Sequence, residues 1–371
     1  MSDRPRLRVA VTVEQSWHVV PGGIAIATVE LLRALVARGD LDLVGVAARH
    51  RGRPPPDLEP PVPVRHLPLG RRALYEAWQH LRVPTVERAT GPVDLVHDAG
   101  YVVPPSRAPL VATVHDLLFF TYPEHYTRHS LQVFRRGFEL ARRHARVVVC
   151  PSRATEAACI EAGIDAGRVR VVPLGVRRSD PDPDRAERVR RRYRVERPYV
   201  LFCGTIEPRK NLRRVIQAFC GVRDRDVELL LAGPQGWKED VGDDLSGLNG
   251  RARTLGFVAR DDLDVLYAGA AAVVYPSLAE GFGLPVLEAM ANGAAVVTSR
   301  GTATEEVAGD AAVLVDPLDV DAIAAAIQRL LDDRALAAEL GSAARARAST
   351  YTWTRSADLV ADIYAEVAAT G

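Results

Sequence analysis

The sequence predicts an α/β protein with two parallel, doubly wound sheets, because short apolar runs alternate with segments of helical period in both halves of the chain. In the first half these strand-like runs are residues 7–13, 41–47, 95–97, 110–114 and 147–150. In the second half they are residues 199–203, 227–232, 272–275, 294–298 and 312–315. Between the halves, residues 177–198 are rich in Asp, Pro and Arg, which indicates a boundary loop followed by a polar helix.

The pattern predicts two Rossmann-like domains that face each other across a cleft. The first is expected over residues 1–175 and the second over residues 176–351. A last helix, at about residues 352–371, carries an apolar stripe and is expected to pack against the body of the protein. A chain of 371 residues with 47% hydrophobic content is long enough to bury two such cores.

Composition limits the classes of partner. The formal net charge is +1, which argues against a nucleic acid held by bulk electrostatics. The four cysteines have no metal-ligand spacing and lie in or beside apolar runs, so we interpret them as reduced core residues of a cytoplasmic protein. No secretory leader and no stretch of membrane-spanning length is apparent.

The most informative segment is Glu280-Gly-Phe-Gly-Leu-Pro-Val-Leu-Glu288, which joins a buried strand to a helix. Pro285 suits the first helical turn and Gly293 suits the helix stop. A helix start offers N–H groups and a positive dipole end to an anionic ligand, and the loop glycines let backbone approach that ligand. An ordinary first-turn acid is the alternative interpretation of Glu288 alone.

A second polar segment, Gly204-Thr-Ile-Glu-Pro-Arg209-Lys210-Asn, follows the first strand of the second half. In doubly wound sheets the carboxyl ends of strands bind ligands. Arg209 and Lys210 offer a guanidinium fork and a point charge to a pyrophosphate, whereas a solvated basic turn is the alternative.

Two further candidate sites lie in the first half. Pro21-Gly22-Gly23 separates the first strand from its helix, and it could present backbone N–H groups or simply form a turn. His115 follows the strand at residues 110–114, where a histidine could bind a sugar hydroxyl or be a satisfied structural residue. We interpret His97 as structural.

The long string of acids, glycines and Leu-Pro closely resembles the signature of the retaining glycosyltransferases of family 4. The Arg209-Lys210 and His115-Asp-Leu segments are similar to further family motifs, so the resemblance covers nearly the whole chain. It implies the GT-B fold and a last helix that crosses back to the N-terminal domain. Many members carry Arg directly after Gly204, whereas this chain has Thr205, so one usual phosphate contact is absent.

The resemblance also implies a function and roles for the candidate residues. The protein would move a hexose, with mannose preferred, from a nucleotide-diphosphate sugar to a saccharide or lipid-linked acceptor in cell-surface glycan synthesis. His115 and Glu280 would act at the reacting sugar, and the donor would be bound by the following residues: Gly22, Gly23, Arg209, Lys210, Val258, Gly281, Phe282, Gly283, Leu284 and Glu288. The transfer would retain configuration and would need neither a cofactor nor a metal.

Other interpretations stay open at this point. A catalytically silent nucleotide-sugar binder or a nucleotide-sugar epimerase would suit the same architecture, whereas a phosphorylase is disfavoured because the chain has only two lysines. Four Asp-x-Asp strings, beginning at residues 180, 224, 262 and 319, suit loops and helix caps rather than a metal. The basic segment at residues 135–146 could contact an anionic inner membrane face or be a solvated surface helix.

Overall fold

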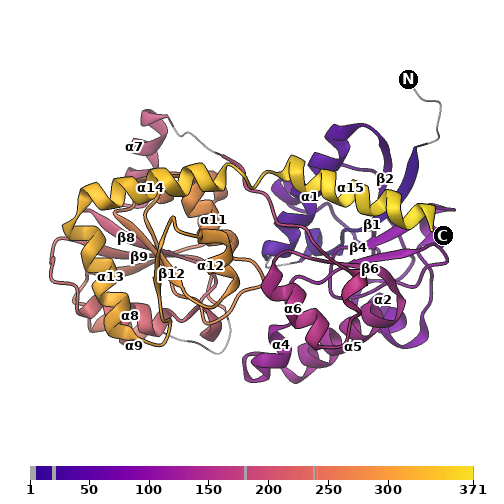
Figure 1. The fold of residues 1–371 in the computed structure, drawn as a ribbon, viewed down its shortest axis with the longest axis horizontal. Coiled ribbons are helices and arrows are strands. Elements are labelled where there is room, and N and C mark those ends of the chain that lie inside the picture. Colours follow the sequence, from indigo (N-terminus) through magenta and orange to yellow (C-terminus); the bar gives the residue numbers. More distant parts are fainter. Residues whose placement is uncertain (1–5, 19–21, 179–181, 237–238, 240, 371) are drawn as a thin grey trace. The chain divides into compact units, whose positions relative to one another are not determined.

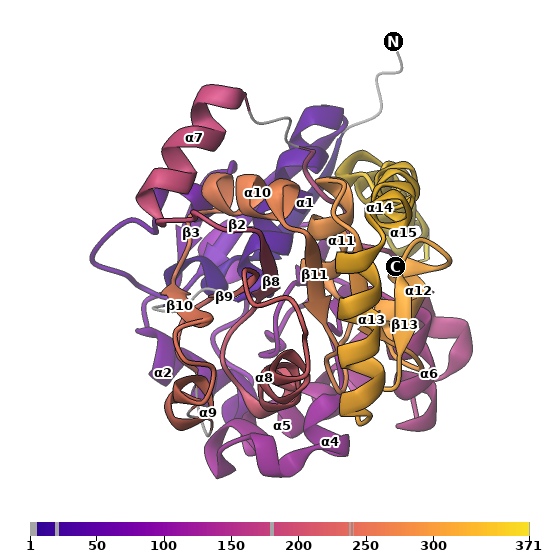
Figure 2. The ribbon, with the colours of Figure 1, turned by 90° about the vertical axis from the view of Figure 1, so that its left-hand side faces the viewer.

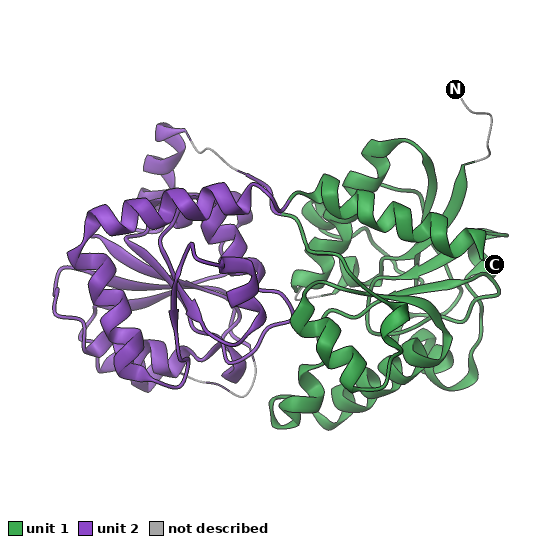
Figure 3. Ribbon diagram, in the orientation of Figure 1, with its two compact units in different colours: residues 1–175, 352–371 green, residues 176–351 purple. Residues whose placement is uncertain are grey.

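The computed structural model describes residues 6–18, 22–178, 182–236, 239 and 241–370. It divides into two compact units (Figure 3). Unit 1 comprises Met1–Gly175 together with Thr352–Gly371, and unit 2 comprises Val176–Tyr351. Each unit contains one parallel sheet with helices on both faces (Figure 1), which confirms the predicted α/β class. Two residues named above lie outside the described residues: Pro21 of the predicted Pro-Gly-Gly turn, and Asp180, the first residue of one Asp-x-Asp string.

The sheet of unit 1 has seven strands in the order β3-β2-β1-β4-β5-β6-β7, and each described pairing is parallel. Its strands are β1 (Leu7–Thr12), β2 (Leu41–Ala47), β3 (Val64–His66), β4 (Leu95–Asp98), β5 (Leu110–Thr113), β6 (Ala145–Cys150) and β7 (Val169–Val171). Its helices are α1 (Gly23–Arg38), α2 (Arg71–Glu76), α3 (Glu87–Thr90), α4 (Leu118–Thr121), α5 (Arg128–His144), α6 (Arg153–Glu161) and α15 (Trp353–Ala369).

The sheet of unit 2 has six strands in the order β10-β9-β8-β11-β12-β13, again paired in parallel. Its strands are β8 (Tyr199–Cys203), β9 (Glu228–Ala232), β10 (Ala252–Gly256), β11 (Ala272–Tyr275), β12 (Val296–Ser299) and β13 (Val313–Val315). Its helices are α7 (Pro183–Arg192), α8 (Leu212–Cys220), α9 (Gly242–Ser246), α10 (Arg260–Gly269), α11 (Leu284–Ala291), α12 (Ala303–Ala308), α13 (Val320–Asp332) and α14 (Arg334–Ala348). Figure 2 shows α10 and α11 above the strands and α8 below them.

The strand order of each unit reverses once, between β1 and β4 in unit 1 and between β8 and β11 in unit 2. We call this place the switch point of the sheet. The loops that follow the two central strands diverge there, because one connection leads to each side of the sheet. The carboxyl end of the sheet at a switch point is therefore where a doubly wound fold has room for a ligand.

Helix α15 belongs to unit 1 although 176 residues, Val176–Tyr351, separate it from the rest of that unit. Its side chains Val360, Ile363, Tyr364 and Val367 are buried in one apolar cluster with residues of α1 and of the central strands. Tyr364 Oη lies 2.6 Å from His97 Nδ1, and Thr113 Oγ1 lies 2.7 Å from the other ring nitrogen. His97 is thus a structural residue, and burial lowers its pKa to about 3.

Three strands were not predicted from the sequence: β3, β7 and β10, each at an edge of its sheet. Their sequences, VRH, VRV and ARTLG, carry arginines and few adjacent apolar residues. An edge strand is partly exposed and uses charged side chains against edge-to-edge pairing, so it lacks the apolar run by which an interior strand is recognised.

Replacement of Tyr364 by Phe should destabilise unit 1, because His97 Nδ1 would lose its partner while remaining buried. A buried polar group left without a hydrogen bond costs about 1–3 kcal/mol. The thermal unfolding midpoint of the full chain should therefore fall for Tyr364→Phe. Tyr122→Phe, which removes a hydroxyl from a half-buried ring of the same unit, is the matched control. Equal midpoints for the two variants would contradict this role of the His97 contact.

Candidate functional site

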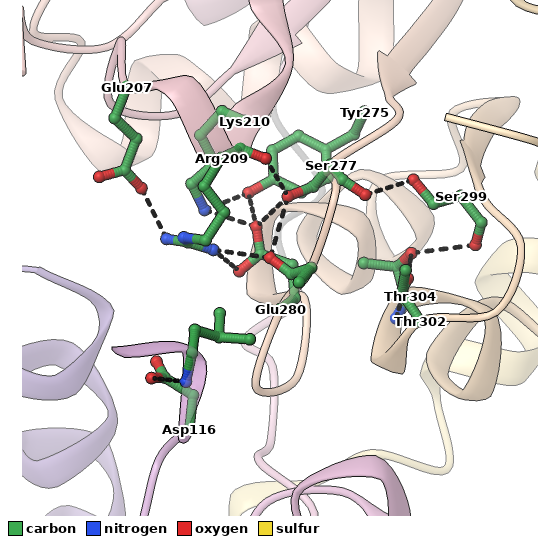
Figure 4. A network of polar contacts seen from close by, with 12 residues as sticks. Asp116, Glu207, Arg209, Lys210, Tyr275, Ser277, Glu280, Ser299, Thr302 and Thr304 are labelled. Carbon is green, nitrogen blue, oxygen red and sulfur yellow. Dashed lines mark hydrogen bonds and ion pairs between the residues drawn. The ribbon is translucent and has the colours of Figure 1, made fainter. Parts of the chain in front are cut away.

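A cluster of polar side chains lies at the switch point of unit 2, on the loops that follow β8 and β11 (Figure 4). We call it the Glu280 cluster, and its members are Glu207, Arg209, Lys210, Tyr275, Ser277 and Glu280. Asn211 joins the two loops, because its Nδ2 donates to the carbonyl oxygens of Pro276 at 2.9 Å and Pro317 at 2.6 Å. The position of the cluster therefore follows from the strand order and from one buried amide.

Glu280 accepts contacts on both carboxylate oxygens. Arg209 Nη1 lies 2.7 Å from Oε2, and Lys210 Nζ donates to Oε1 at 2.7 Å. Tyr275 Oη also donates to Oε1, at 2.8 Å, and Ser277 Oγ lies 2.8 Å from the same atom. The structure thus brings together three residues predicted for the site, Arg209, Lys210 and Glu280, in direct contact.

The charges of the cluster balance. Burial would raise the pKa of Glu280, but Arg209 and Lys210 outweigh it and hold the pKa at about 2. Burial and Arg209 lower the pKa of Lys210, while Glu280 opposes that shift. Arg209 Nη2 also contacts Glu207 Oε1 at 2.6 Å, so two cations face two carboxylates. An anionic ligand at this place has to compete with Glu280 for the cations.

The loop from Gly281 to Leu284 leads directly into α11. Gly283 has φ +108°, and a Cβ there would lie 2.8 Å from Thr304 Cγ2, so only glycine fits this helix start without strain. Phe282, predicted to contact the donor, is buried and its ring centroid lies 6.0 Å from that of Tyr351. A ligand at this loop would therefore meet the backbone of Phe282 rather than its side chain.

Glu288 lies on α11, with a side chain that is 15% exposed. Burial raises the pKa of Glu288 to about 7, with Asp264 adding to the shift and Arg260 opposing it. Arg260 Nη2 is 3.9 Å from Glu288 Oε1. Burial raises the pKa of Cys203, the last residue of β8, and the charge of Glu288 adds to that shift. Glu288 is close to the switch point but is not a member of the Glu280 cluster.

Val258, the last site residue predicted in unit 2, is buried and precedes α10. The neighbouring Phe257 is 75% exposed, so an aromatic ring borders this part of the carboxyl end of the sheet. The sequence pattern contained no signal that would select Tyr275, Ser277 or Asn211. The contact of Lys210 with Tyr275 and that of Asn211 with Pro276 each span 65 residues of sequence, and only the sheet order creates them.

The remaining predicted site residues belong to unit 1. Gly22 is the N-cap of α1, and among the described residues no atom apart from its chain neighbours lies within 4 Å of where its Cβ would be. Gly23 is the first residue of the same helix. His115 Nε2 donates to the carbonyl oxygen of Ala99 at 3.0 Å, and burial lowers the His115 pKa. His115 is therefore neutral at pH 7, with Nδ1 as its basic nitrogen.

The described residues contain neither a metal-binding group of side chains nor a membrane-spanning helix. In the part of the chain that the structure describes, no three His, Cys, Asp or Glu side chains are grouped so that they could hold a metal ion. Among the same residues, no helix has both the length and the apolar composition required to cross a bilayer.

Two family models match the chain. Glycosyltransferase Family 4 matches residues 21–180, and Glycosyl transferases group 1 matches residues 184–347. O-antigen chain mannosyltransferase B of Escherichia coli is 34% identical over 271 residues, which cover 70% of this chain and 71% of that protein. The MMP alpha-(1->4)-mannosyltransferase of Mycolicibacterium hassiacum is 32% identical over 274 residues, which cover 69% of this chain and 65% of that protein.

The fold has solved counterparts. The structure of Anabaena HepE in complex with UDP and glucose superposes with a TM-score of 0.74 at 22% identity, and it covers 97% of this chain and 100% of that one. This likeness confirms the GT-B fold expected from the sequence.

Glu288 should make stability depend on pH. Its folded pKa of about 7 lies above the ordinary value of 4.5, so the folded protein holds this proton more tightly than the unfolded chain does. The buried carboxylate then costs no stability below pH 4.5 and an increasing amount as pH rises through 7. At 1.36 kcal/mol for each pKa unit, the rise from 4.5 to about 7 corresponds to roughly 3 kcal/mol, so Glu288→Gln should stabilise the protein by roughly 3 kcal/mol at pH 8.5 and by less than about 1 kcal/mol at pH 5.

The measurement is the unfolding midpoint of Glu288→Gln and wild type at both pH values. Glu339→Gln, a change at an exposed acid of the same unit, is the control and should shift neither midpoint. A Glu288→Gln effect of the same size at pH 5 and pH 8.5 would show that Glu288 does not carry the raised pKa.

Proposed function

We propose that this chain, which belongs to glycosyltransferase family 4 and to the group 1 glycosyltransferases, moves a hexose from a nucleotide-diphosphate sugar to a saccharide or lipid-linked acceptor. The observation that carries the proposal is the buried Glu280 cluster at the switch point of unit 2. It joins two cations to a carboxylate beside the start of α11, where a diphosphate and a sugar can be held together.

The donor diphosphate would take the place of Glu280 as the partner of Arg209 and Lys210. Lys210 is buried and Arg209 is partly buried, and the loops hold both in place, so they would stabilise charge on the leaving diphosphate without a metal ion. The exchange would free Glu280 to accept hydrogen bonds from hydroxyls of the transferred sugar. Backbone N–H groups of Gly281, Phe282, Gly283 and Leu284 would approach the same sugar.

Glu288 would accept hydrogen bonds from the donor ribose, and the segment at Val258 would border the nucleobase. In unit 1, Gly22 and Gly23 would approach the donor diphosphate and the acceptor. His115 would accept a hydrogen bond from a sugar hydroxyl at Nδ1, because Nε2 already donates to Ala99. These assignments are proposals that rest on the family resemblance and on the geometry of each unit.

The reaction is proposed to retain configuration. The bond between the anomeric carbon and the diphosphate oxygen breaks, and the acceptor hydroxyl forms its bond on the same face of the sugar. The acceptor proton passes to an oxygen of the leaving diphosphate, so the step needs no protein nucleophile. Glu280 and His115 would orient the sugar and stabilise the positive charge that develops on its ring.

Mannose is the proposed hexose, in the synthesis of a cell-surface glycan. Two relatives of this chain are named as mannosyltransferases, one of them for an O-antigen chain. We also propose that α5 contacts an anionic membrane face, because Arg128, Arg135 and Arg143 are exposed along it and Phe120, at 43% exposure, lies beside it. A solvated basic helix is the alternative.

Donor binding tests the proposed function. Calorimetry with GDP, UDP, ADP and their hexose conjugates, with a chelator present, should find one nucleotide that binds wild type. Glu288→Ala should weaken that binding by on the order of tenfold to a hundredfold, since a hydrogen bond to a charged group contributes about 1.5–3 kcal/mol. Lys210→Ala should weaken it as well, and the exposed Glu339→Ala should not.

Other results of these experiments would contradict parts of the proposed function or favour another one. Loss of binding on chelation would contradict the metal-independent mechanism. Binding without any turnover would favour a silent nucleotide-sugar binder, and conversion of the donor sugar without transfer would favour an epimerase. Equal affinity of wild type, Glu288→Ala and Lys210→Ala would remove the proposed donor site.

Stereochemistry can be tested before the acceptor is identified. Glycosyltransferases can transfer slowly to water, so proton NMR of a donor incubated with this protein alone should first detect the released hexose in the anomeric configuration of the donor. Glu280→Gln should slow the release, because the amide cannot stabilise positive charge on the sugar ring. First appearance of the opposite anomer would contradict retention.

A further inference from the structure

A hollow of about 390 Å³ opens on unit 1 and plays no part in the donor site described above. It is lined by Trp17, His50, Gly70, Arg71, Arg72 and Ala73. This volume lies within the roughly 300–1,000 Å³ that small-molecule sites occupy. The hollow is therefore large enough for a ligand of monosaccharide size.

The hollow lies at the carboxyl end of the unit 1 sheet. Trp17 follows β1, His50 follows β2, and Gly70 and Arg71 follow β3, which are three neighbouring strands. All three strands run in the same direction, so the segments that follow them meet at one edge of the sheet. In doubly wound folds this is the edge that binds ligands.

The hollow is positively charged. Among the residues that the structure describes, neither Arg71 nor Arg72 forms an ion pair with an acidic side chain. Glu14, the buried acid nearby, already accepts from the Ala48 N–H at 2.7 Å and lies 2.9 Å from His50 Nε2. The guanidinium groups of Arg71 and Arg72 can therefore bind an anion from solution.

A positive field also reaches the histidine next to Trp17. Burial lowers the pKa of His18 to about 4, and Arg71 and His50 add to that shift. His18 Nε2 is buried without a hydrogen-bond partner in the described structure. The guanidinium of Arg71 thus lies close enough to His18 to disfavour a second positive charge there.

An aromatic wall completes the hollow. The Trp17 ring stacks on His50, with centroids 4.7 Å apart and planes at 6°, and Trp17 Nε1 donates to the Gly52 carbonyl at 2.8 Å. These contacts fix the indole in one orientation. A fixed indole beside two guanidinium groups suits a ligand that joins an apolar sugar face to a multiply charged anion.

We propose that this hollow binds the phosphate group of a phosphorylated acceptor saccharide, with Arg71 and Arg72 as the phosphate ligands and Trp17 against the sugar. The inference rests on the proposed function, since it names the chemical class of that acceptor. A dianionic phosphate matches two unpaired guanidinium groups better than a singly charged carboxylate does. The phosphate can belong to a soluble sugar phosphate or to a lipid headgroup.

Calorimetry on the full chain tests the site with inorganic phosphate, mannose 6-phosphate, mannose and glucuronate. Mannose 6-phosphate should bind at least tenfold more tightly than mannose or glucuronate, and inorganic phosphate should compete with it. Arg71→Gln and Arg72→Gln should each weaken this binding by tenfold or more. The control Arg88→Gln, at an exposed arginine of α3 that does not line the hollow, should not.

A second readout reports on the place of binding. Mannose 6-phosphate should change the tryptophan fluorescence of wild type, and Trp17→Phe should abolish that change. If the soluble probe does not bind, vesicles of phosphatidylcholine with phosphatidylinositol provide the lipid arm. Co-sedimentation that requires phosphatidylinositol and is lost in Arg71→Gln would assign the phosphate to a lipid.

The outcomes separate this inference from the donor assignment. Equal binding of phosphorylated and neutral sugars, or equal behaviour of Arg71→Gln and Arg88→Gln in both arms, would overturn the phosphate site. Nucleotide-sugar binding should be the same in wild type, Arg71→Gln and Arg72→Gln. Failure of wild type to bind any nucleotide sugar would instead overturn the proposed function and leave the phosphate result to be judged by itself.

Discussion

The contact on which the rest of unit 2 depends is the pairing of Glu280 with Arg209 and Lys210 inside the protein. Buried charges are costly unless they are paired and hydrogen-bonded, so the loops after β8 and β11 have to meet with close tolerance. Asn211 and Ser277 hold that meeting in place through backbone carbonyls of the two loops. The strand order of the sheet brings the two loops to the same place, and the ion pairs determine how their side chains are arranged there.

Much of the fold could be predicted because interior parallel strands are apolar over their whole length. The limits of β2, β8 and β11 agree with the sequence pattern, since both faces of these strands are covered by helices. The edge strands β3 and β10 were missed for the opposite reason. All of their residues are exposed or partly exposed, so the arginines on them conceal the strand pattern.

The site could be predicted less completely. Residue type and spacing indicated Arg209, Lys210 and Glu280, but not that the three contact one another across 70 residues of sequence. The resemblance implied Phe282 as a donor contact through its loop, and the structure adds that its ring is packed into unit 2, which leaves the backbone as the group that could face a ligand. These contacts depend on which side chains the folded sheet brings together, and the local sequence carries no information on side chains that are distant along the chain.

Because helix α15 is synthesised last, it affects how unit 1 folds during synthesis. A ribosome completes residues 176–351 before it reaches Trp353, so all of unit 2 is synthesised while unit 1 still lacks one helix. During that interval the surface that α15 covers, formed by α1 and the central strands, is without its partner. Domains fold as units during synthesis, and exposed apolar surface favours aggregation. Unit 1 is thus the part of this protein for which a chaperone would matter most.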